Sequence, residues 1–138
     1  MIQRIQTVYL LIVVVLQTIL FFSPIADYIV GADQNTYKIT SDFLLASLTL
    51  ITAVTAFASI FMYGKRTLQI RVNVFNIILL LVLQGLIAYY SAKIHVSYEA
   101  VSFSVPVVFP IISAILTLAA IRSIIKDELL IKTLNRIR

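Results

Sequence analysis

The sequence predicts an all-α membrane protein, a bundle of four transmembrane helices with both termini on the cytoplasmic side. Three observations lead to this fold class: an apolar composition, four apolar runs of bilayer length, and a one-sided distribution of cations. Of the 138 residues, 61% are hydrophobic and 12% are charged, whereas a soluble domain has roughly 45–50% apolar and about 25% charged residues. So little polar surface cannot cover a particle in water. The length allows a single domain, residues 1–138.

The four apolar runs lie at about residues 5–22, 43–63, 72–92 and 105–125. A helix that crosses a bilayer needs about 20 mostly apolar residues. No Asp, Glu, Lys, Arg or His lies in the interior of a run, and lipid offers no water to backbone groups, so each run is expected to be helical. The first run follows Arg4 as in a signal peptide, but no small-x-small cleavage site follows it, so we expect an uncleaved helix.

The cations set the orientation of the predicted bundle. Nine of the eleven Lys and Arg residues lie on the side that holds both termini and the basic loop Gly64–Arg71. Because Lys and Arg near helix ends resist translocation, this side is predicted to be cytoplasmic. The positive charge is therefore interpreted as membrane orientation and not as a nucleic-acid surface. The residues expected to contact lipid headgroups or a partner are Lys65, Arg66, Arg71, Lys132, Arg136 and Arg138.

The two outer loops carry strand formers. Gly31-Ala32-Asp33-Gln34-Asn35 has the composition of a turn. It lies between Tyr28-Ile29-Val30 and Tyr37-Lys38-Ile39-Thr40, which favour strands. In the second loop, apolar and polar residues alternate from Ile94 to Glu99 and apolar positions continue to Phe103, which also indicates a strand. Two alternatives stay open: a small β-element shared by the two loops, or irregular loops.

The C-terminal tail, residues 126–138, has the pattern of an amphipathic helix. Its apolar residues recur at helical spacing and its polar residues fall on the opposite side. We expect a cytoplasmic extension of the fourth helix that lies near the headgroups or against a partner. The apolar face holds Leu130, Ile131, Leu134 and Ile137, and the polar face holds Lys132, Thr133 and Arg136.

The polar residues inside the predicted spans are uncharged. Asn73, Asn76 and Gln84 follow one face of the third helix, and Gln17 lies in the first. Gln17 and Gln84 both lie roughly 18 Å from the cytoplasmic helix ends, so we expect a hydrogen bond across a helix interface. The alternative is a polar lining for a small-solute or ion path. Packing is favoured because too few polar groups align to hydrate a pore.

A stripe of small residues follows one face of the second helix. Such a stripe lets another backbone approach closely in a membrane. It is interpreted as the inner face of the bundle, with a surface for a second protein as the alternative. Pro106 and Pro110 lie at the outer end of the fourth helix, where a proline in the first turn is tolerated. The stripe consists of Thr49, Thr52, Ala56 and Ser59, and the fourth helix adds Ser113, Thr117 and Ala120.

The residues needed for most enzymatic chemistry are missing from the sequence. There is no cysteine, and His95 is the only histidine, so neither a zinc cluster nor a bis-histidine haem site is predicted. The predicted spans carry no embedded carboxylate, which argues against ion-coupled antiport. We therefore predict no catalytic residue, no cofactor and no metal. The outer acids are interpreted as solvated flanks, and they are Asp27, Asp33, Asp42 and Glu99.

The two ends of the chain resemble those of a known family. The similar stretches are Met1-Ile2-Gln3-Arg4-Ile5-Gln6-Thr7-Val8-Tyr9-Leu10 and Ala120-Ile121-Arg122-Ser123-Ile124-Ile125-Lys126-Asp127-Glu128-Leu129-Leu130, with Arg136-Ile137-Arg138 at the close. The sequence resembles a family of small four-helix bacterial membrane proteins, catalogued as a domain of unknown function and typical of Bacteroidota. The resemblance implies a bacterial inner-membrane location. It implies no activity and no site residue.

Two functions follow from these patterns as hypotheses. The first is a non-catalytic accessory or assembly subunit of a larger inner-membrane complex, because no catalytic set is present and the basic tail suits contact with lipid or a partner. The second is a small homo-oligomeric channel or facilitator that uses Gln17, Asn76 and Gln84. The expected partners are the lipid bilayer and either a membrane protein or a second copy of the chain. No nucleic-acid partner is expected.

Overall fold

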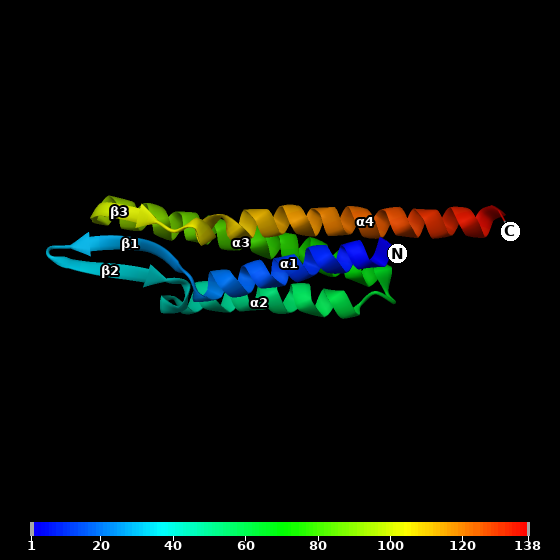
Figure 1. Ribbon diagram of the computed structural model, residues 1–138, viewed down its shortest axis with the longest axis horizontal. Helices are drawn as coiled ribbons and strands as arrows, with labels where there is room; N and C mark the ends of the chain where they lie inside the picture. Colours follow the sequence, from blue (N-terminus) through cyan, green and yellow to red (C-terminus); the bar gives the residue numbers. More distant parts are fainter. Residues whose placement is uncertain (1, 138) are drawn as a thin grey trace.

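The structure is a computed structural model that describes residues 2–137. It is a four-helix bundle with a small sheet at one end (Figure 1). All four helices are long and apolar enough to cross a membrane, as the sequence predicted. The elements in order are α1 (Ile2–Phe22), β1 (Pro24–Val30), β2 (Asp33–Lys38), η1 (Ile39–Ser41), α2 (Phe43–Phe61), α3 (Arg66–Ser97), β3 (Glu99–Phe103), η2 (Val105–Val108) and α4 (Phe109–Ile137).

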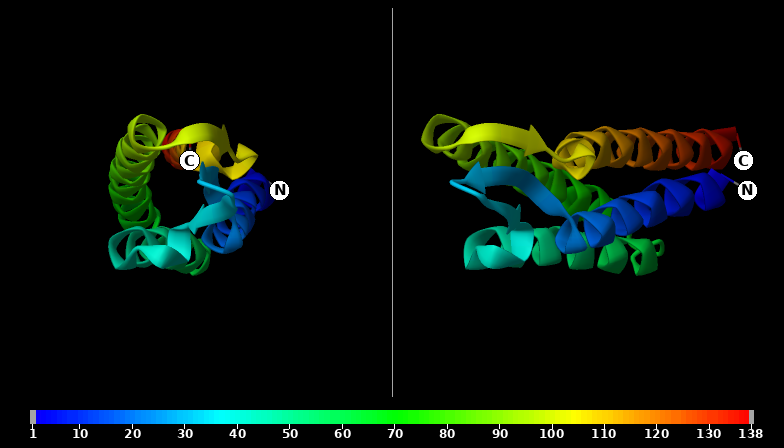
Figure 2. Two further views of the ribbon diagram at one scale, coloured as in Figure 1. Left: turned by 90° about the vertical axis from the view of Figure 1, so that its left-hand side faces the viewer. Right: turned by 60° about the vertical axis from the view of Figure 1, so that its left-hand side comes forward.

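The helices form a ring in which each packs against its neighbours in the sequence and α4 closes on α1. Consequently α1 lies diagonally across the bundle from α3, and α2 lies diagonally from α4 (Figure 2, left). The two ends of the chain lie at one end of the bundle with the α2–α3 connection, and the sheet lies at the other (Figure 1). The structure therefore gathers the basic segments of the sequence at one end.

The sheet joins the two loops at the far end of the bundle. β1 lies between β2 and β3 and pairs antiparallel with both. Gly31 in the β1–β2 turn has a φ of +65°, a conformation that favours glycine because it has no Cβ. Of the two alternatives for the loops, the shared β-element is confirmed. The predicted strand at 94–97 is wrong, because α3 continues to Ser97 and Ile94 extends its buried face.

Other boundaries also differ from the hydropathy pattern. The predicted basic loop is mostly helix, since α3 begins at Arg66 and only residues 62–65 connect it to α2. Arg, Leu and Gln are good helix formers, so the helix starts before the apolar run does. The fourth apolar run begins with the 3₁₀ turn η2, and α4 then continues without a break to Ile137. The predicted helical extension of the fourth helix is thus confirmed, whereas its side of the membrane stays a prediction.

The bundle interior is apolar next to the sheet and more polar away from it. The apolar region lies where the ends of the helices pack against β1 and η1. Most of the buried polar side chains lie around the middle of the bundle or toward the termini, where apolar residues such as Leu10 and Val13 are also buried. The apolar cluster consists of Leu20, Ile25, Ala26, Ile39, Leu45, Leu83, Ile87 and Ile94.

Candidate functional site

Buried polar side chains come from all four helices, and we call this set the polar half-core. On α3 the first three buried positions are amides, and the next three are Leu80, Leu83 and Ile87. Burying a polar group is costly unless it is hydrogen-bonded, so the partners of these side chains decide what the half-core can do. Its members are Gln6, Gln17, Thr49, Thr52, Ser59, Gln69, Asn73, Asn76, Ser113, Thr117 and Asp127.

Gln17 joins three helices. Its Nε2 donates to Ser113 Oγ on α4 at 2.9 Å, and Thr52 Oγ1 on α2 donates to its Oε1 at 3.3 Å. The predicted Gln17–Gln84 hydrogen bond is not formed, because α1 and α3 are diagonal and Gln17 bonds to adjacent helices instead. Gln84 is only half-buried, and its Oε1 has no hydrogen-bond partner among residues 2–137.

The stripe of small residues on α2 lies inside the bundle, where Thr49, Thr52, Ala56 and Ser59 are fully buried. Thr49 donates to the Leu45 main-chain oxygen, and the single hydroxyl hydrogen of Thr52 is shared between Gln17 Oε1 and the Thr49 main-chain oxygen at 2.8 Å. The main-chain oxygen of Ser59 accepts a hydrogen bond of 3.0 Å from Gln69 Nε2 and so connects α2 to α3. Gln69 was not singled out in the sequence, because it falls in the stretch interpreted as a basic loop.

Asn73 and Asn76 are fully buried on the inward face of α3. In the part of the chain that the structure describes, no side-chain nitrogen or oxygen of either residue has a hydrogen-bond partner. Each amide offers two N–H donors and a carbonyl acceptor. A guest that both donates and accepts, such as water or a neutral polar solute, matches this set better than an ion of either sign.

Gln6 and Asp127 close the polar half-core at the end near the termini. Gln6 Nε2 donates to Asp127 Oδ2 at 2.6 Å, and each residue is only 6% exposed. Asp127 was not singled out in the sequence, because it falls in the stretch interpreted as the amphipathic tail. Because α4 continues past the apolar run, Asp127 lies on the same buried face as Ala120 and Ile124. The spacing of four and three residues was the signal that could have found it.

The basic residues that the structure describes are spread over several segments. Lys65 and Arg71 are exposed beside the α2–α3 connection, and Arg66 is half-buried there. On α4, Lys132 Nζ lies 3.1 Å from Glu128 Oε1, and Arg136 is exposed. The remaining predicted contact residue, Arg138, lies outside the described residues. The basic groups thus surround one end of the bundle without converging on a common point.

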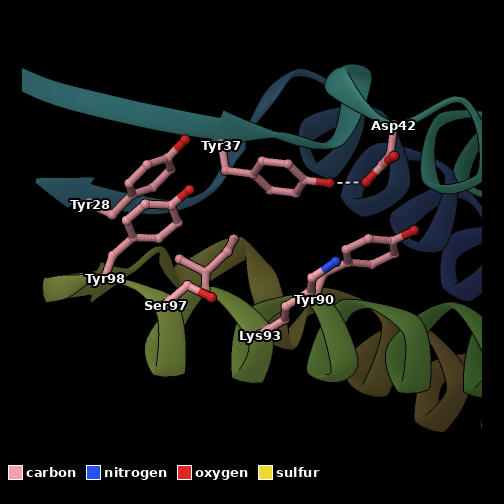
Figure 3. Close-up of a pocket in the computed structure, with 8 residues that line it drawn as sticks. Tyr28, Tyr37, Asp42, Tyr90, Lys93, Ser97 and Tyr98 are labelled. Atoms are coloured by element: carbon pink, nitrogen blue, oxygen red, sulfur yellow. Dashed lines mark hydrogen bonds between the residues drawn. The ribbon is translucent and has the colours of Figure 1, made fainter. Parts of the chain in front are cut away.

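A second candidate site, which we call the tyrosine pocket, lies at the sheet end. It is a cavity of about 320 Å³ between the β1–β2 hairpin and the last turns of α3 (Figure 3). Tyr28 stacks on Tyr98 with ring centroids 4.3 Å apart, and Tyr37 faces Tyr90 at 6.2 Å. The sequence did not predict this pocket, because only the sheet topology brings β1, β2 and α3 together. Asp42 and Lys93 also line it.

Neither site has the composition of a metal centre. Among residues 2–137, no group of three or more His, Cys, Asp or Glu side chains is placed to hold a metal ion. His95, the only histidine, stacks on Phe103 with nearly parallel rings. The polar half-core provides hydrogen-bonding groups inside the bundle. The tyrosine pocket provides aromatic ring faces and two charges at the sheet end.

The fold defines a class: a bundle of four helices, each able by length and composition to cross a membrane, with a three-stranded sheet at one end. Residues 2–137 match a family described as a domain of unknown function, DUF4293, and the chain belongs to this family. The predicted membership of an uncharacterised family is thereby confirmed, whereas its bacterial group stays a prediction. No curated protein and no solved structure matches the chain.

Proposed function

We propose that the protein is an integral membrane protein of the bacterial inner membrane and a non-catalytic accessory or assembly subunit of a larger complex there. Both termini would face the cytoplasm. The membrane location is supported by the four apolar helices. The orientation is supported by the sequence, in which nine of the eleven Lys and Arg residues flank the apolar runs on the side of the termini.

The observation that carries the accessory role is the projection of α4 beyond the other helices (Figure 1). α4 has 29 residues, whereas α1 has 21 and α2 has 19. At 1.5 Å per residue α4 is about 44 Å long, which exceeds a hydrocarbon core of about 30 Å. Residues 129–137 are all exposed, so this segment has no neighbour in the bundle.

The projecting segment presents an apolar face. Ile131 and Leu134 follow Asp127 at steps of four and three residues, so they continue the buried face of α4 past the end of the bundle. Because α4 runs straight in Figure 1, this face would extend away from the bilayer and not lie flat in the headgroups. An apolar helix face in that position fits an amphipathic helix of another membrane protein, which would lengthen the bundle.

Two leucines of similar exposure allow a matched test of this proposal. Leu134 is 63% exposed on the apolar face, and Leu129 is 59% exposed on the opposite side. After gentle solubilisation and crosslinking, the unmodified chain should travel with a defined set of other proteins. Leu134→Ser should lose this complex, whereas Leu129→Ser should keep it. A chain that carries no partner, or two variants that behave alike, would rule out docking through this face.

A second candidate function, a facilitator for small polar solutes, is favoured by Asn73 and Asn76 alone. Because these side chains face the centre of one bundle, the path would run within each copy and not between copies. Liposomes that contain the protein should then change volume faster than empty ones after an osmotic step, and Asn76→Leu should remove the difference. Flux through a homo-oligomer that is lost in Gln84→Leu would instead favour a channel over the accessory role.

A further inference from the structure

We propose that the tyrosine pocket binds the headgroup of a zwitterionic phospholipid with a primary amine, of the phosphatidylethanolamine class. This site goes beyond the accessory role. It depends on the chain spanning a membrane, but not on any protein partner. Three features of the pocket point to this ligand: its level along the bundle, its two charges and its aromatic walls.

The level of the pocket matches a headgroup layer. Tyr90 and Lys93 lie about 28 and 33 Å along α3 from Arg71, at 1.5 Å per residue. A hydrocarbon core is about 30 Å thick, so a bilayer surface near Arg71 places the opposite surface at the pocket. Tyrosine is enriched at both membrane–water interfaces because its ring is apolar and its hydroxyl is polar. Four tyrosines from both loops and α3 meet here.

The two charges of the pocket come from different walls. Asp42 precedes α2, and Lys93 belongs to α3. Asp42 is the N-cap residue of α2, yet its side chain makes no capping hydrogen bond. Its carboxylate instead accepts a hydrogen bond from the Tyr37 hydroxyl inside the pocket (Figure 3). Among residues 2–137, Lys93 forms no ion pair with it. An anion can therefore bind Lys93 while a cation lies near Asp42.

The aromatic walls suit the cationic half of such a ligand. An ammonium group is attracted to the face of a tyrosine ring within about 6 Å of its centre. The hydroxyls of Tyr28, Tyr90 and Tyr98 have no hydrogen-bond partner within residues 2–137, so they can donate to phosphate oxygens. In Figure 3 the Tyr28 and Tyr98 hydroxyls point the same way. In a ligand with a phosphodiester and a primary amine, the phosphate can bind Lys93 and the phenols while the ammonium group binds Asp42.

Other headgroups use only part of this set. A phosphoglycerol headgroup has no cation for Asp42. A phosphocholine headgroup has a cation but no N–H donor for the carboxylate. A neutral sugar engages the phenols and ring faces but leaves both charges without an opposite charge. The ethanolamine class is therefore selected by two separate charges in one cavity, a positive one at Lys93 and a negative one at Asp42.

The test is native mass spectrometry of the full chain with an equal mixture of short-chain phosphatidylethanolamine, phosphatidylglycerol and phosphatidylcholine. We expect ethanolamine-lipid adducts to dominate. Lys93→Gln and Asp42→Asn should each reduce them by about tenfold, since each removes one charge-assisted hydrogen bond, and Lys93→Arg should retain them. The matched controls are Lys38→Gln and Asp33→Asn on β2, which are exposed and do not line the pocket; these should bind as the unmodified chain does.

Three results would overturn the proposal. If the three lipids are retained equally, the chain binds lipid without selectivity. If the control variants also lose the ethanolamine-lipid adducts, the two pocket charges do not determine the binding. Soluble glycerophosphoethanolamine, titrated while the near-ultraviolet signal of the tyrosines is followed, distinguishes the source. If this soluble probe saturates the pocket at concentrations at which phosphatidylethanolamine does not bind, the ligand is a free phosphodiester amine and not a lipid headgroup. None of these readouts needs a protein partner, so they are independent of the accessory role.

Discussion

Gln6 and Asp127 lie 121 positions apart in the chain and form a buried hydrogen bond of 2.6 Å between α1 and α4. Among residues 5–137, whose side chains the structure describes, Asp127 Oδ1 has no partner, so Gln6 supplies the one hydrogen bond that the carboxylate receives there. A buried carboxylate is stable only with such compensation. At the scale of single residues, the stability of the polar half-core is most sensitive to substitutions in this pair.

Gln6→Leu should lower the free energy of unfolding by about 1.5–3 kcal/mol, because it leaves a buried charged group unsatisfied. Removing both partners takes the unpaired charge away, so Gln6→Leu with Asp127→Leu should be more stable than Gln6→Leu alone. Denaturant titrations in detergent micelles measure both. A double variant at least as unstable as the single one would contradict the proposed pairing.

Gln17 and Asn76 give opposite predictions although both are fully buried amides. Gln17→Leu loses bonds to two helices and should destabilise the bundle by about 0.6–2 kcal/mol. Asn76→Leu removes an amide that has no partner in the described protein, so the bundle should be as stable as before or up to about 1–3 kcal/mol more stable. The same titrations test this. Equal destabilisation by the two changes would mean that Asn76 is held by a bound solvent or solute molecule.

The residues inside the bundle were predictable where helical spacing lay within an apolar run. Gln17, Asn73, Asn76 and the α2 stripe all face the interior, as the spacing suggested. Gln6 and Asp127 were not singled out, because Gln6 lies at the start of the first apolar run and Asp127 lies beyond the end of the fourth. Which polar groups bond to one another depends on the ring order of the helices, and hydropathy carries no information on that order.

At the scale of elements, hydropathy located the helices but not their ends. α3 and α4 both extend beyond their apolar runs, because charged residues such as Arg66 and Lys132 are good helix formers. The β1–β2 hairpin was predictable from its turn chemistry. A β-element shared by the two loops was one of the two alternatives, but the strand order, with β1 between β2 and β3, was not predicted. The tyrosine pocket depends on how β1, β2 and α3 lie together, and the sequence pattern does not give that arrangement.

The hairpin offers a test at this scale. Gly31 has a φ of +65°, and the space that a Cβ would occupy is open, so Gly31→Ala adds backbone strain and no clash. The left-handed conformation costs a non-glycine residue about 1–2 kcal/mol. Amides of β1 and β2 should therefore exchange with solvent faster in this variant. Gly64→Ala is the control, because Gly64 also has open space and no positive φ. Equal exchange in both variants would contradict the turn geometry.

At the scale of the whole molecule, the chain is polarised along the bundle axis. The termini and most cations lie at one end, and the polar half-core extends from that end past the middle of the bundle. The sheet, the apolar cluster and the tyrosine pocket lie at the other. The accessory role and the lipid site both follow from this polarity once the bundle spans a bilayer. The proposed orientation places the end with the termini in the cytoplasm and the sheet end at the outer surface.

The measurement that tests this account most directly is single-cysteine labelling, since the chain has no native cysteine. Asp33→Cys lies at the sheet end and Lys65→Cys lies in the α2–α3 connection, and both positions are exposed. With a membrane-impermeant maleimide on intact spheroplasts, the account predicts labelling of Asp33→Cys at once and of Lys65→Cys only after lysis. Labelling of Lys65→Cys in intact spheroplasts, or recovery of the chain in the soluble fraction, would contradict it.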